Sequence, residues 1–349
     1  MSLNRRDFLK LGLGACALPA VGALRAETLV GEEMYVFGTL VDVNVSARDE
    51  SAARAALAEV SHAFTRQNRD WHAWKPGELG ELNRALAAGR SLAVGPELLP
   101  LLHEARELAR QSGGLFNPAI GKLVGLWGFH NDELPVGAPP PAAELAALAA
   151  AAPSLDDLAF DGSRVASRNP QVQIDLGGYA KGVALDRALD TLAARGFGDA
   201  LVNLGGNLAV SGSRDGRPWK IAVRHPQGAG ALAALEVSGR MAVVTSGTYE
   251  RYRQHGERRY PHIIDPRSGQ PAAHVASATV LHPDAARADV AATALVVAGP
   301  QAWTEVARGL GVAEVMIVDE HGRVELTPAM ARRVRFVERP LAVRTVSLT

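Results

Sequence analysis

Two charged side chains flank a glycine pair in a stretch that could hold an anion. Asp175 and Lys181 stand on either side of Gly177-Gly178, in the run Asp-Leu-Gly-Gly-Tyr-Ala-Lys. The run is typical of a strand that breaks at the glycines and continues as a helix. A helix start offers free backbone N–H groups and a positive dipole end, which suit a phosphate that Lys181 could also reach. The alternative is a tight turn in which Asp175 is only a capping residue.

A second polar pair lies much later in the chain. Asp289 and Thr293 are four residues apart, so they share one face if this segment is helical. A carboxylate and a hydroxyl one turn apart are hard oxygen ligands, which Mg²⁺ takes while keeping water or phosphate oxygens. The alternative is that Asp289 caps its own helix and Thr293 is a core threonine.

One histidine beside a turn is the candidate general base. His262 and Asp265 lie next to a turn over 266–269. The unperturbed pKa of a histidine lies near neutrality, so its ring can take up a proton during a reaction. A purely structural role for His262 is equally open, and His255 and His274 are weaker candidates.

Aromatic residues gather in two stretches although they make up only 5% of the chain. Trp71 and Trp74 precede a Pro-Gly turn, and Phe116, Trp127 and Phe129 follow a double glycine in a stretch that also carries Asn117. Such clustering is typical of a site for a planar ligand. The alternative for each tryptophan is a place in the hydrophobic core.

The elements that would position these residues alternate between helices and short strands. Helices are expected over 51–68, 96–114, 141–153, 179–198 and 289–311, and strands over 36–45, within 157–176, 200–212, 219–226, 232–247 and 276–283, with a hairpin around His321-Gly322. Several strands follow one another closely enough to pair antiparallel. We therefore expect an α+β fold with mixed, largely antiparallel sheets and packed helices.

The composition predicts a packed globular protein whose main partner is not a nucleic acid. Of 349 residues, 47% are apolar, which is enough for a sizeable core. Lysine plus arginine and aspartate plus glutamate number 37 each, so the formal net charge is zero. A neutral chain lacks the basic excess with which proteins bind a phosphate backbone.

The N-terminus resembles a bacterial twin-arginine export signal. Arg5-Arg6 precede a mildly apolar stretch over 11–24, which is too short and too glycine-rich for a stable membrane span. We expect residues 1–26 to be this signal, with cleavage after Ala26 and delivery to the periplasm. The alternative is an ordinary amphipathic first helix.

The single cysteine, Cys16, excludes an intrachain disulfide. Its surroundings faintly resemble a lipoprotein cleavage box, so a lipid anchor at Cys16 is a second alternative. The apolar stretch continues beyond this residue, which favours the cleavage after the signal.

Eight blocks, in order and covering about residues 34–300, resemble the ApbE family of flavin transferases. The blocks are VFGTLVDVNV, WKPGELGELN, GGLFNPAIGKLVGLWGF, IDLGGYAKGVALDRA, LVNLGGNLAVSG, VVTSGTYERYR, HIIDPRSGQP and ARADVAATALVVAG. The resemblance implies one two-lobed, T-fold-like domain over residues 27–349.

The resemblance also implies an activity. Members of the family are Mg²⁺-dependent enzymes of the periplasmic side that bind FAD and cleave its pyrophosphate. They transfer FMN through a phosphoester to a threonine or serine of an acceptor flavoprotein and release AMP. Family acceptors include flavin subunits of Nqr-type sodium-pumping quinone reductases, of Rnf complexes and of the nitrous-oxide-reduction system. Contact with a membrane would then arise only through the partner or through a lipid anchor.

The resemblance assigns roles to twelve residues. Asp289, Thr293 and a backbone oxygen of Gly178 would hold Mg²⁺, and His262 would take the proton of the acceptor hydroxyl. Eight residues would contact FAD: Phe37, Trp74, Leu115, Phe116, Asn117, Asp175, Lys181 and Ile263.

Three positions depart from the family pattern. Phe37 stands where methionine is frequent, Gly77 replaces the usual serine, and Asn117 replaces a common aspartate. None of the three is a proposed metal ligand or the proposed base. Two other functions remain open: an exported FAD-binding carrier of the NosX-like kind, and an FAD pyrophosphatase that uses water as the acceptor. The presence of Asp289, Thr293 and His262 favours catalysis over a carrier role.

Overall fold

The computed structural model describes residues 28–131, 133 and 135–348. The predicted export signal over 1–26, with Cys16, lies outside these described residues. No helix in the described part of the chain combines the length and apolarity that a membrane span requires.

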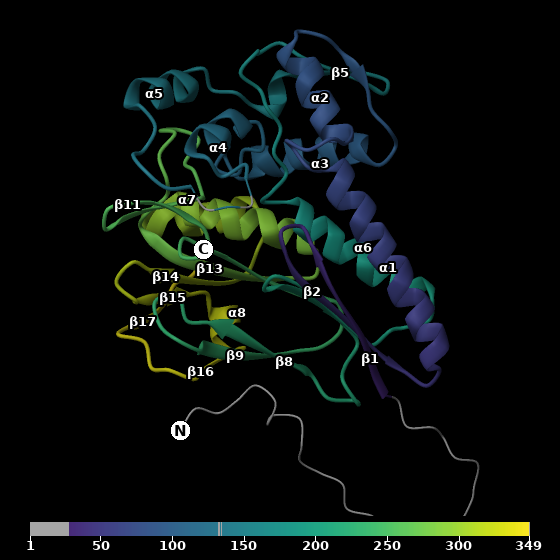
Figure 1. Cartoon of the computed structure of the whole chain (residues 1–349). Helices are drawn as coiled ribbons and strands as arrows, with labels where there is room; N and C mark the ends of the chain where they lie inside the picture. The colour runs from purple at the N-terminus through teal and green to yellow at the C-terminus, as the bar shows by residue number, and fades with distance from the viewer. Residues whose placement is uncertain (1–27, 132, 134, 349) are drawn as a thin grey trace, which may run out of the picture.

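A nine-stranded sheet forms the centre of the molecule (Figure 1). Its strands follow the order β1 (Thr28–Val36), β2 (Thr39–Ala47), β6 (Ala200–Leu204), β7 (Asn207–Ser211), β10 (Met241–Gly247), β13 (Val275–His282), β14 (Glu314–Asp319), β15 (Val324–Leu326) and β17 (Val343–Thr345). All neighbours pair antiparallel except β15 and β17, which run parallel. The expectation of a largely antiparallel sheet is therefore confirmed.

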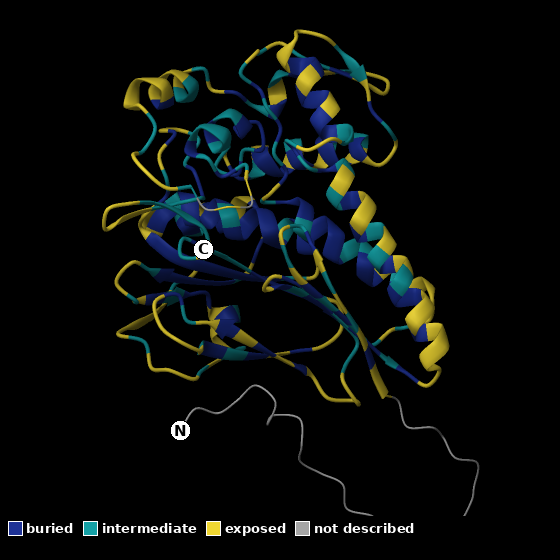
Figure 2. Cartoon of the chain, viewed as in Figure 1, coloured by how far each residue is buried: buried dark blue, intermediate teal, exposed yellow. Residues whose placement is uncertain are grey.

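The central sheet is covered on both faces. One face packs against a three-stranded sheet of β16 (Val334–Phe336), β9 (Ala231–Val237) and β8 (Trp219–Arg224), and the other against the helices α1 (Glu50–Asp70), α6 (Ala180–Ala194) and α7 (Ala285–Gly309). Side chains alternate between the two faces, as in any strand. In β10, Val243 packs toward the small sheet, and Ala242 and Val244 pack toward the helices. Figure 2 shows the resulting buried layer, with exposure confined to the outer surfaces.

Four of the remaining helices form an upper lobe above α6 and α7 (Figure 1). It contains α2 (Glu78–Ala87), α3 (Leu98–Gln111), α4 (Gly121–Trp127), α5 (Ala142–Ala150), the 3₁₀ turn η2 (Leu155–Asp157) and a small sheet of β3 (Leu92–Ala93), β5 (Arg164–Ser167) and β4 (Leu158–Asp161). A separate two-stranded ribbon, β11 (Tyr252–His255) and β12 (Arg258–Pro261), and the short helix α8 (Pro328–Ala331) complete the fold. Trp127 of α4 is a core residue, because it is fully buried and its indole N–H donates to the Gly269 carbonyl at 2.8 Å.

The segment before the glycine pair is not the regular strand that the sequence suggested. Only an isolated bridge joins Gln173 to Ile120. The side chain of Asn83 replaces a strand neighbour, since its oxygen accepts from the Ile174 N–H and its amide donates to the Ile174 carbonyl, both at 2.8 Å. One buried amide thus satisfies the N–H and carbonyl of Ile174, while the N–H groups of Gln173 and Asp175 donate to the Ala119 and Pro118 carbonyls. Periodicity cannot reveal a side chain that replaces a strand in this way.

The long helix near the C-terminal side also differs from the expectation. It begins at Ala285 and is broken at Gly299, where φ is 72° and ψ is 175°. A glycine adopts that backbone readily, and Pro300 then restarts the helix without needing an N–H donor. Helices α2 and α4 lie in stretches where no helix was expected.

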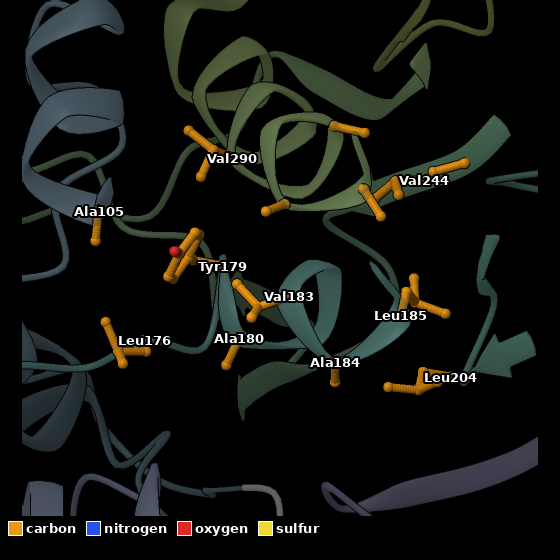
Figure 3. Close-up of a cluster of buried hydrophobic side chains, with 14 of the residues drawn as sticks. Ala105, Leu176, Tyr179, Ala180, Val183, Ala184, Leu185, Leu204, Val244 and Val290 are labelled. Carbon is orange, nitrogen blue, oxygen red and sulfur yellow. The ribbon is translucent and has the colours of Figure 1, made fainter. Parts of the chain in front are cut away.

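Helices α6 and α7 cross at very short range through Gly182. A Cβ built on Gly182 would lie 2.3 Å from the Ala285 carbonyl oxygen and 2.6 Å from the Ala286 Cα. Val183 of α6 and Val290 of α7 belong to the buried cluster of these two helices, and Figure 3 labels both. The backbone contact fixes the start of α6 against the start of α7.

Replacing Gly182 with alanine should therefore destabilise the protein. We expect a loss of about 1–3 kcal/mol in the free energy of unfolding, because the clashing atoms are backbone and cannot rotate away. Urea unfolding followed by circular dichroism measures the change. Gly198→Ala is the matched control, since a Cβ at Gly198 meets no atom within 4 Å; equal midpoints for the two variants would contradict the close crossing.

Candidate functional site

A cavity of about 600 Å³ opens between the upper lobe and the central sheet. Its wall includes the β1–β2 turn, the segment after α1, the loop before α4, the glycine pair, the end of β10 and the start of α7. All twelve predicted site residues line it: Phe37, Trp74, Leu115, Phe116, Asn117, Asp175, Gly178, Lys181, His262, Ile263, Asp289 and Thr293. The fold thus gathers residues that the sequence spreads over more than half of its length.

Asp289 is buried at the bottom of this arrangement, with 2% of its surface exposed. Its Oδ2 accepts from the Gly182 N–H at 3.0 Å, and its Oδ1 accepts from the Asn207 amide at 3.1 Å. The cap of its own helix is instead Asp284, which accepts from the Arg287 N–H. Asp289 therefore does not cap α7, and its carboxylate instead binds the start of α6.

The pKa of the Asp289 carboxyl is raised, because burial disfavours its charged form. The Lys181 charge and the two hydrogen bonds act in the opposite direction. A cation beside the carboxylate would offset the same burial penalty.

Thr293 lies directly against the glycine pair. A Cβ built on Gly178 would be 3.1 Å from the Thr293 hydroxyl oxygen, and that hydroxyl lies 3.3 Å from the Ser246 hydroxyl. Asp289, Thr293 and the Gly177-Gly178 turn are thus neighbours, as the family resemblance implies. Half-buried and facing the cavity, Thr293 is not an ordinary core threonine.

The donor set around Asp289 fits a hard cation by its chemistry. A carboxylate, hydroxyls and backbone carbonyls are the oxygen ligands that Mg²⁺ accepts. The described residues contain no cluster of three or more His, Cys, Asp or Glu side chains that could hold a metal. A cation here would therefore need the single carboxylate of Asp289 together with neutral oxygens and those of a ligand.

The glycine turn offers fewer free N–H groups than the sequence suggested. The Gly177 N–H donates to Asp175 Oδ1 at 2.9 Å, and the Ala180 N–H donates to the Leu176 carbonyl at 2.7 Å. The Gly182 N–H is taken by Asp289. Asp175 is thus a turn-stabilising acid as well as a cavity residue, and burial raises the pKa of its carboxyl.

Lys181 supplies positive charge beside Asp289 in a cavity that Lys75 and Arg251 also line. Among the described residues its ammonium group has no hydrogen-bond partner and no ion pair, and it lines the cavity. Its charge opposes the rise in the pKa of Asp289 and of Glu250 and helps to lower the pKa of His262. An anionic ligand would find this lysine available without breaking an existing contact.

His262 is held so that one ring nitrogen can accept a proton. Its Nδ1 lies 3.2 Å from the Arg251 carbonyl oxygen, which can only accept, so Nδ1 carries the hydrogen. The other nitrogen, Nε2, then has the free lone pair when the ring is neutral. Burial, with the charges of Arg251 and Lys181, lowers the pKa of His262 to about 4, which keeps the ring neutral at physiological pH.

Aromatic rings form the opposite wall. Phe37 lies in the two-residue turn between β1 and β2 with a φ of 54°, a left-handed conformation uncommon for a bulky residue. Its ring packs edge-on against Phe64 at 5.8 Å, and the Trp74 ring lies 6.0 Å from the His130 ring. Trp71 lines the cavity too, although it is mostly buried. The wall can accept a planar ring system.

Two departures from the family pattern have a local cause. A Cβ on Gly77 would lie 2.0 Å from the Arg69 carbonyl oxygen, so a serine cannot fit here without moving α1. Asn117 donates to the Pro153 carbonyl at 2.8 Å and accepts from the Ala119 N–H at 3.0 Å. An aspartate could not make the first of these bonds.

Three neighbours of the site were not identified from the sequence. Asn207 orients Asp289, Ser246 contacts Thr293, and Arg251 holds His262 through its carbonyl. All three lie in the blocks that carry the family resemblance. Their roles depend on pairings across the sheet and the ribbon, which sequence spacing does not show.

Comparisons with known proteins agree on one family. The ApbE family model matches residues 37–317. The chain is 44% identical to the FAD:protein FMN transferase of Rhodobacter capsulatus over 96% of this chain, and it spans 65% of that protein's length. It is 33% identical to the FAD:protein FMN transferase of Treponema pallidum, over 95% of this chain and 96% of that protein. Its structure is similar to the ApbE protein of Thermotoga maritima, with a TM-score of 0.80, 28% identity and coverage of 88% and 100%.

Proposed function

Because this chain belongs to the ApbE family, we propose that it is an FAD:protein FMN transferase that attaches FMN to a Thr or Ser hydroxyl of its acceptor. FAD is one substrate and a protein acceptor is the other. A phosphoester forms between the hydroxyl oxygen and the FMN phosphorus, the pyrophosphate bond breaks, and AMP leaves. The observation that carries this proposal is the single cavity that joins His262, Lys181, Asp289 and Thr293 to an aromatic wall.

The chain's own residues account for binding of the dinucleotide. Phe37 and Trp74 offer flat apolar surface to the rings of FAD, and Lys181 offers its phosphates an ammonium group that forms no ion pair among the described residues. Leu115, Phe116 and Ile263 add apolar surface to the cavity wall and so exclude water from the space beside the bound ligand. Asp175 and Asn117 shape the loop edges through their backbone contacts.

His262 is the base in this proposal. As the acceptor oxygen approaches phosphorus, its proton passes to the free Nε2, while the Nδ1–H bond to the Arg251 carbonyl keeps the ring oriented. A hydroxyl has a pKa far above neutrality, so a positioned base contributes on the order of 10²–10⁴-fold in rate.

Asp289, Thr293 and a backbone oxygen of Gly178 would hold Mg²⁺. When bound, the ion supplies positive charge that offsets the negative charge growing on the pyrophosphate. Asn207 and the Gly182 N–H keep the carboxylate of Asp289 in place for this role. The arrangement is supported by the contact between the glycine turn and Thr293.

We further propose that the enzyme works in the periplasm after twin-arginine export. The Arg5-Arg6 pattern and the short apolar stretch after it support this location. The acceptor would then be a periplasm-facing flavoprotein subunit of the Nqr, Rnf or nitrous-oxide-reduction kind.

Mass spectrometry of the acceptor tests the proposed reaction. The mature protein is incubated with FAD, Mg²⁺ and a candidate acceptor domain, and we expect the acceptor to gain the mass of FMN while AMP accumulates. Free FMN and AMP beside an unmodified acceptor would instead indicate an FAD pyrophosphatase. FAD that stays bound and intact would indicate a carrier. Replacing the acceptor threonine or serine with alanine is the control that locates the bond.

A further inference from the structure

The β11–β12 ribbon is an arginine-rich arm whose first strand starts beside the cavity and whose second strand returns to it, because Arg251 precedes β11 and His262 follows β12. Between Arg251 and Arg259 the chain carries four arginines and one glutamate, although its overall formal charge is zero. The ribbon pairs only with itself apart from one bridge to Val136, and it lies at the side of the molecule between the upper lobe and the sheets (Figure 1). Its tip, residues 255–259, is exposed.

The arginines at the base of the arm and those near its tip have different contacts. Arg253 donates to the Trp127 carbonyl at 3.0 Å and Arg251 donates to the Asn131 carbonyl at 2.5 Å, so both hold the base against the segment after α4. Arg258 stacks over the Tyr260 ring at 4.8 Å, and Arg259 stacks over the Tyr252 ring at 4.5 Å.

The two tip arginines carry charge that the protein itself does not neutralise. Within the described residues, neither Arg258 nor Arg259 forms an ion pair with a carboxylate, whereas arginines elsewhere do, such as Arg323 with Asp319 at 2.7 Å. Stacking on tyrosine fixes each guanidinium plane but leaves its N–H edges available. Such a pre-oriented group suits a carboxylate, which it can bind through two parallel hydrogen bonds.

Arg258 and Arg259 lie outside the cavity that the proposed function assigns to the nucleotide. Arg251 and His262, at the base of the same arm, line that cavity. Strand β12 leads from the tip to the base: at about 3.3 Å per residue, Arg259 lies roughly 10 Å along the chain from His262. An acceptor segment that brings its hydroxyl to His262 and continues along β12 in extended form would reach this charge within about three residues.

We propose that the β11–β12 arm docks an acidic segment of the protein acceptor through Arg258 and Arg259. This inference rests on the proposed function, since it assigns the place where that function's second substrate binds. The acceptor should carry an aspartate or glutamate about three residues of extended chain away from the modified hydroxyl. Because the Arg251 carbonyl also holds His262, the arm connects acceptor docking to the position of the base.

Binding of a labelled peptide tests the arm without requiring transfer. The probe is a short fluorescein-labelled peptide with one threonine and aspartates about three residues to either side, and its partner probe has asparagines instead. We expect Arg258→Glu combined with Arg259→Glu to raise the Kd for the aspartate peptide at least about 10-fold, as measured by fluorescence anisotropy. The asparagine peptide should bind weakly to every variant, and added salt should weaken only the aspartate peptide.

The matched control reverses two exposed arginines far from the cavity. Arg335 and Arg339 are exposed, form no carboxylate ion pair among the described residues and do not line the cavity, so Arg335→Glu with Arg339→Glu makes the same change in net charge. We expect this variant to bind the aspartate peptide as the unchanged protein does. Equal binding by the arm variant and the control would overturn the proposal.

Two further readouts separate the arm from its alternatives. Arm-dependent sedimentation with phosphatidylglycerol vesicles, without arm-dependent peptide binding, would overturn the proposal in favour of a lipid surface. If FMN transfer fails while arm-dependent peptide binding holds, the proposed function is wrong and the docking site stands. If transfer occurs with the same acceptor KM in the arm variant and the unchanged protein, the function stands and the docking site is wrong.

Discussion

Asp289→Asn should reduce FMN transfer by at least about 10³-fold, the largest effect that we expect from one substitution. The change keeps the size of the side chain but removes the one carboxylate charge beside Thr293 and the glycine turn. Both carboxylate oxygens accept hydrogen bonds, from Gly182 and Asn207. The substitution replaces one of these oxygens with an amide group that can only donate, so one of the two bonds is lost. Initial rates of FMN transfer, measured across a range of Mg²⁺ concentrations, give the size of the loss.

A substitution of the same kind on the same helix serves as the control. Asp284→Asn keeps a good N-cap for α7, lies outside the cavity and should leave the rate nearly unchanged. Calorimetric titration of Mg²⁺ into FAD-loaded protein should give binding for Asp284→Asn and much weaker binding for Asp289→Asn. An Asp289→Asn protein with an unaltered rate and unaltered Mg²⁺ dependence would place the cation elsewhere.

The sequence predicted the elements that carry the proposed site residues better than the bonds that position those residues. Periodicity and spacing predicted the antiparallel sheets and the helices that carry Lys181 and Asp289, because these features are local. The approach of Gly178 to Thr293 followed only from the family resemblance, since no local pattern reports contact between distant segments. The same limit applies to Gly77, which stands where the family usually has serine. The sequence showed only this difference, whereas the structure shows that the Arg69 carbonyl leaves no room for a side chain.

Side chains that bond to backbone groups in place of other backbone groups also made some predictions from the sequence wrong. Asn83 stabilises the stretch around Ile174 in place of a neighbouring strand, so an apolar alternation predicted a strand where the structure has only one bridge. At the start of α6, Asp175 and Asp289 occupy N–H groups that a simple helix-terminus picture leaves free for phosphate. At this turn the positive charge for the ligand therefore comes from the Lys181 side chain rather than from the backbone.

His262→Ala should slow FMN transfer by about 10²–10⁴-fold while FAD binding stays nearly unchanged. Among the described histidines that line the cavity, only His262 has its Nδ1 held by a backbone carbonyl. This bond leaves Nε2 as the proton acceptor. Stopped-flow measurement of a single turnover gives the rate of the chemical step, and quenching of flavin fluorescence gives the affinity for FAD.

The pH dependence gives a second signature of the same residue. Since the pKa of His262 is lowered to about 4, kcat/KM, which reports the free enzyme, should stay level as the pH falls below the usual histidine range. The rate should then fall as the ring gains a proton near pH 4, and this limb should be missing from the residual activity of His262→Ala. His274→Ala, at an exposed histidine beside Glu320, should keep both the rate and the limb. A His262→Ala protein that transfers FMN at the normal rate, with the acid limb intact, would show that another group takes the proton of the acceptor hydroxyl.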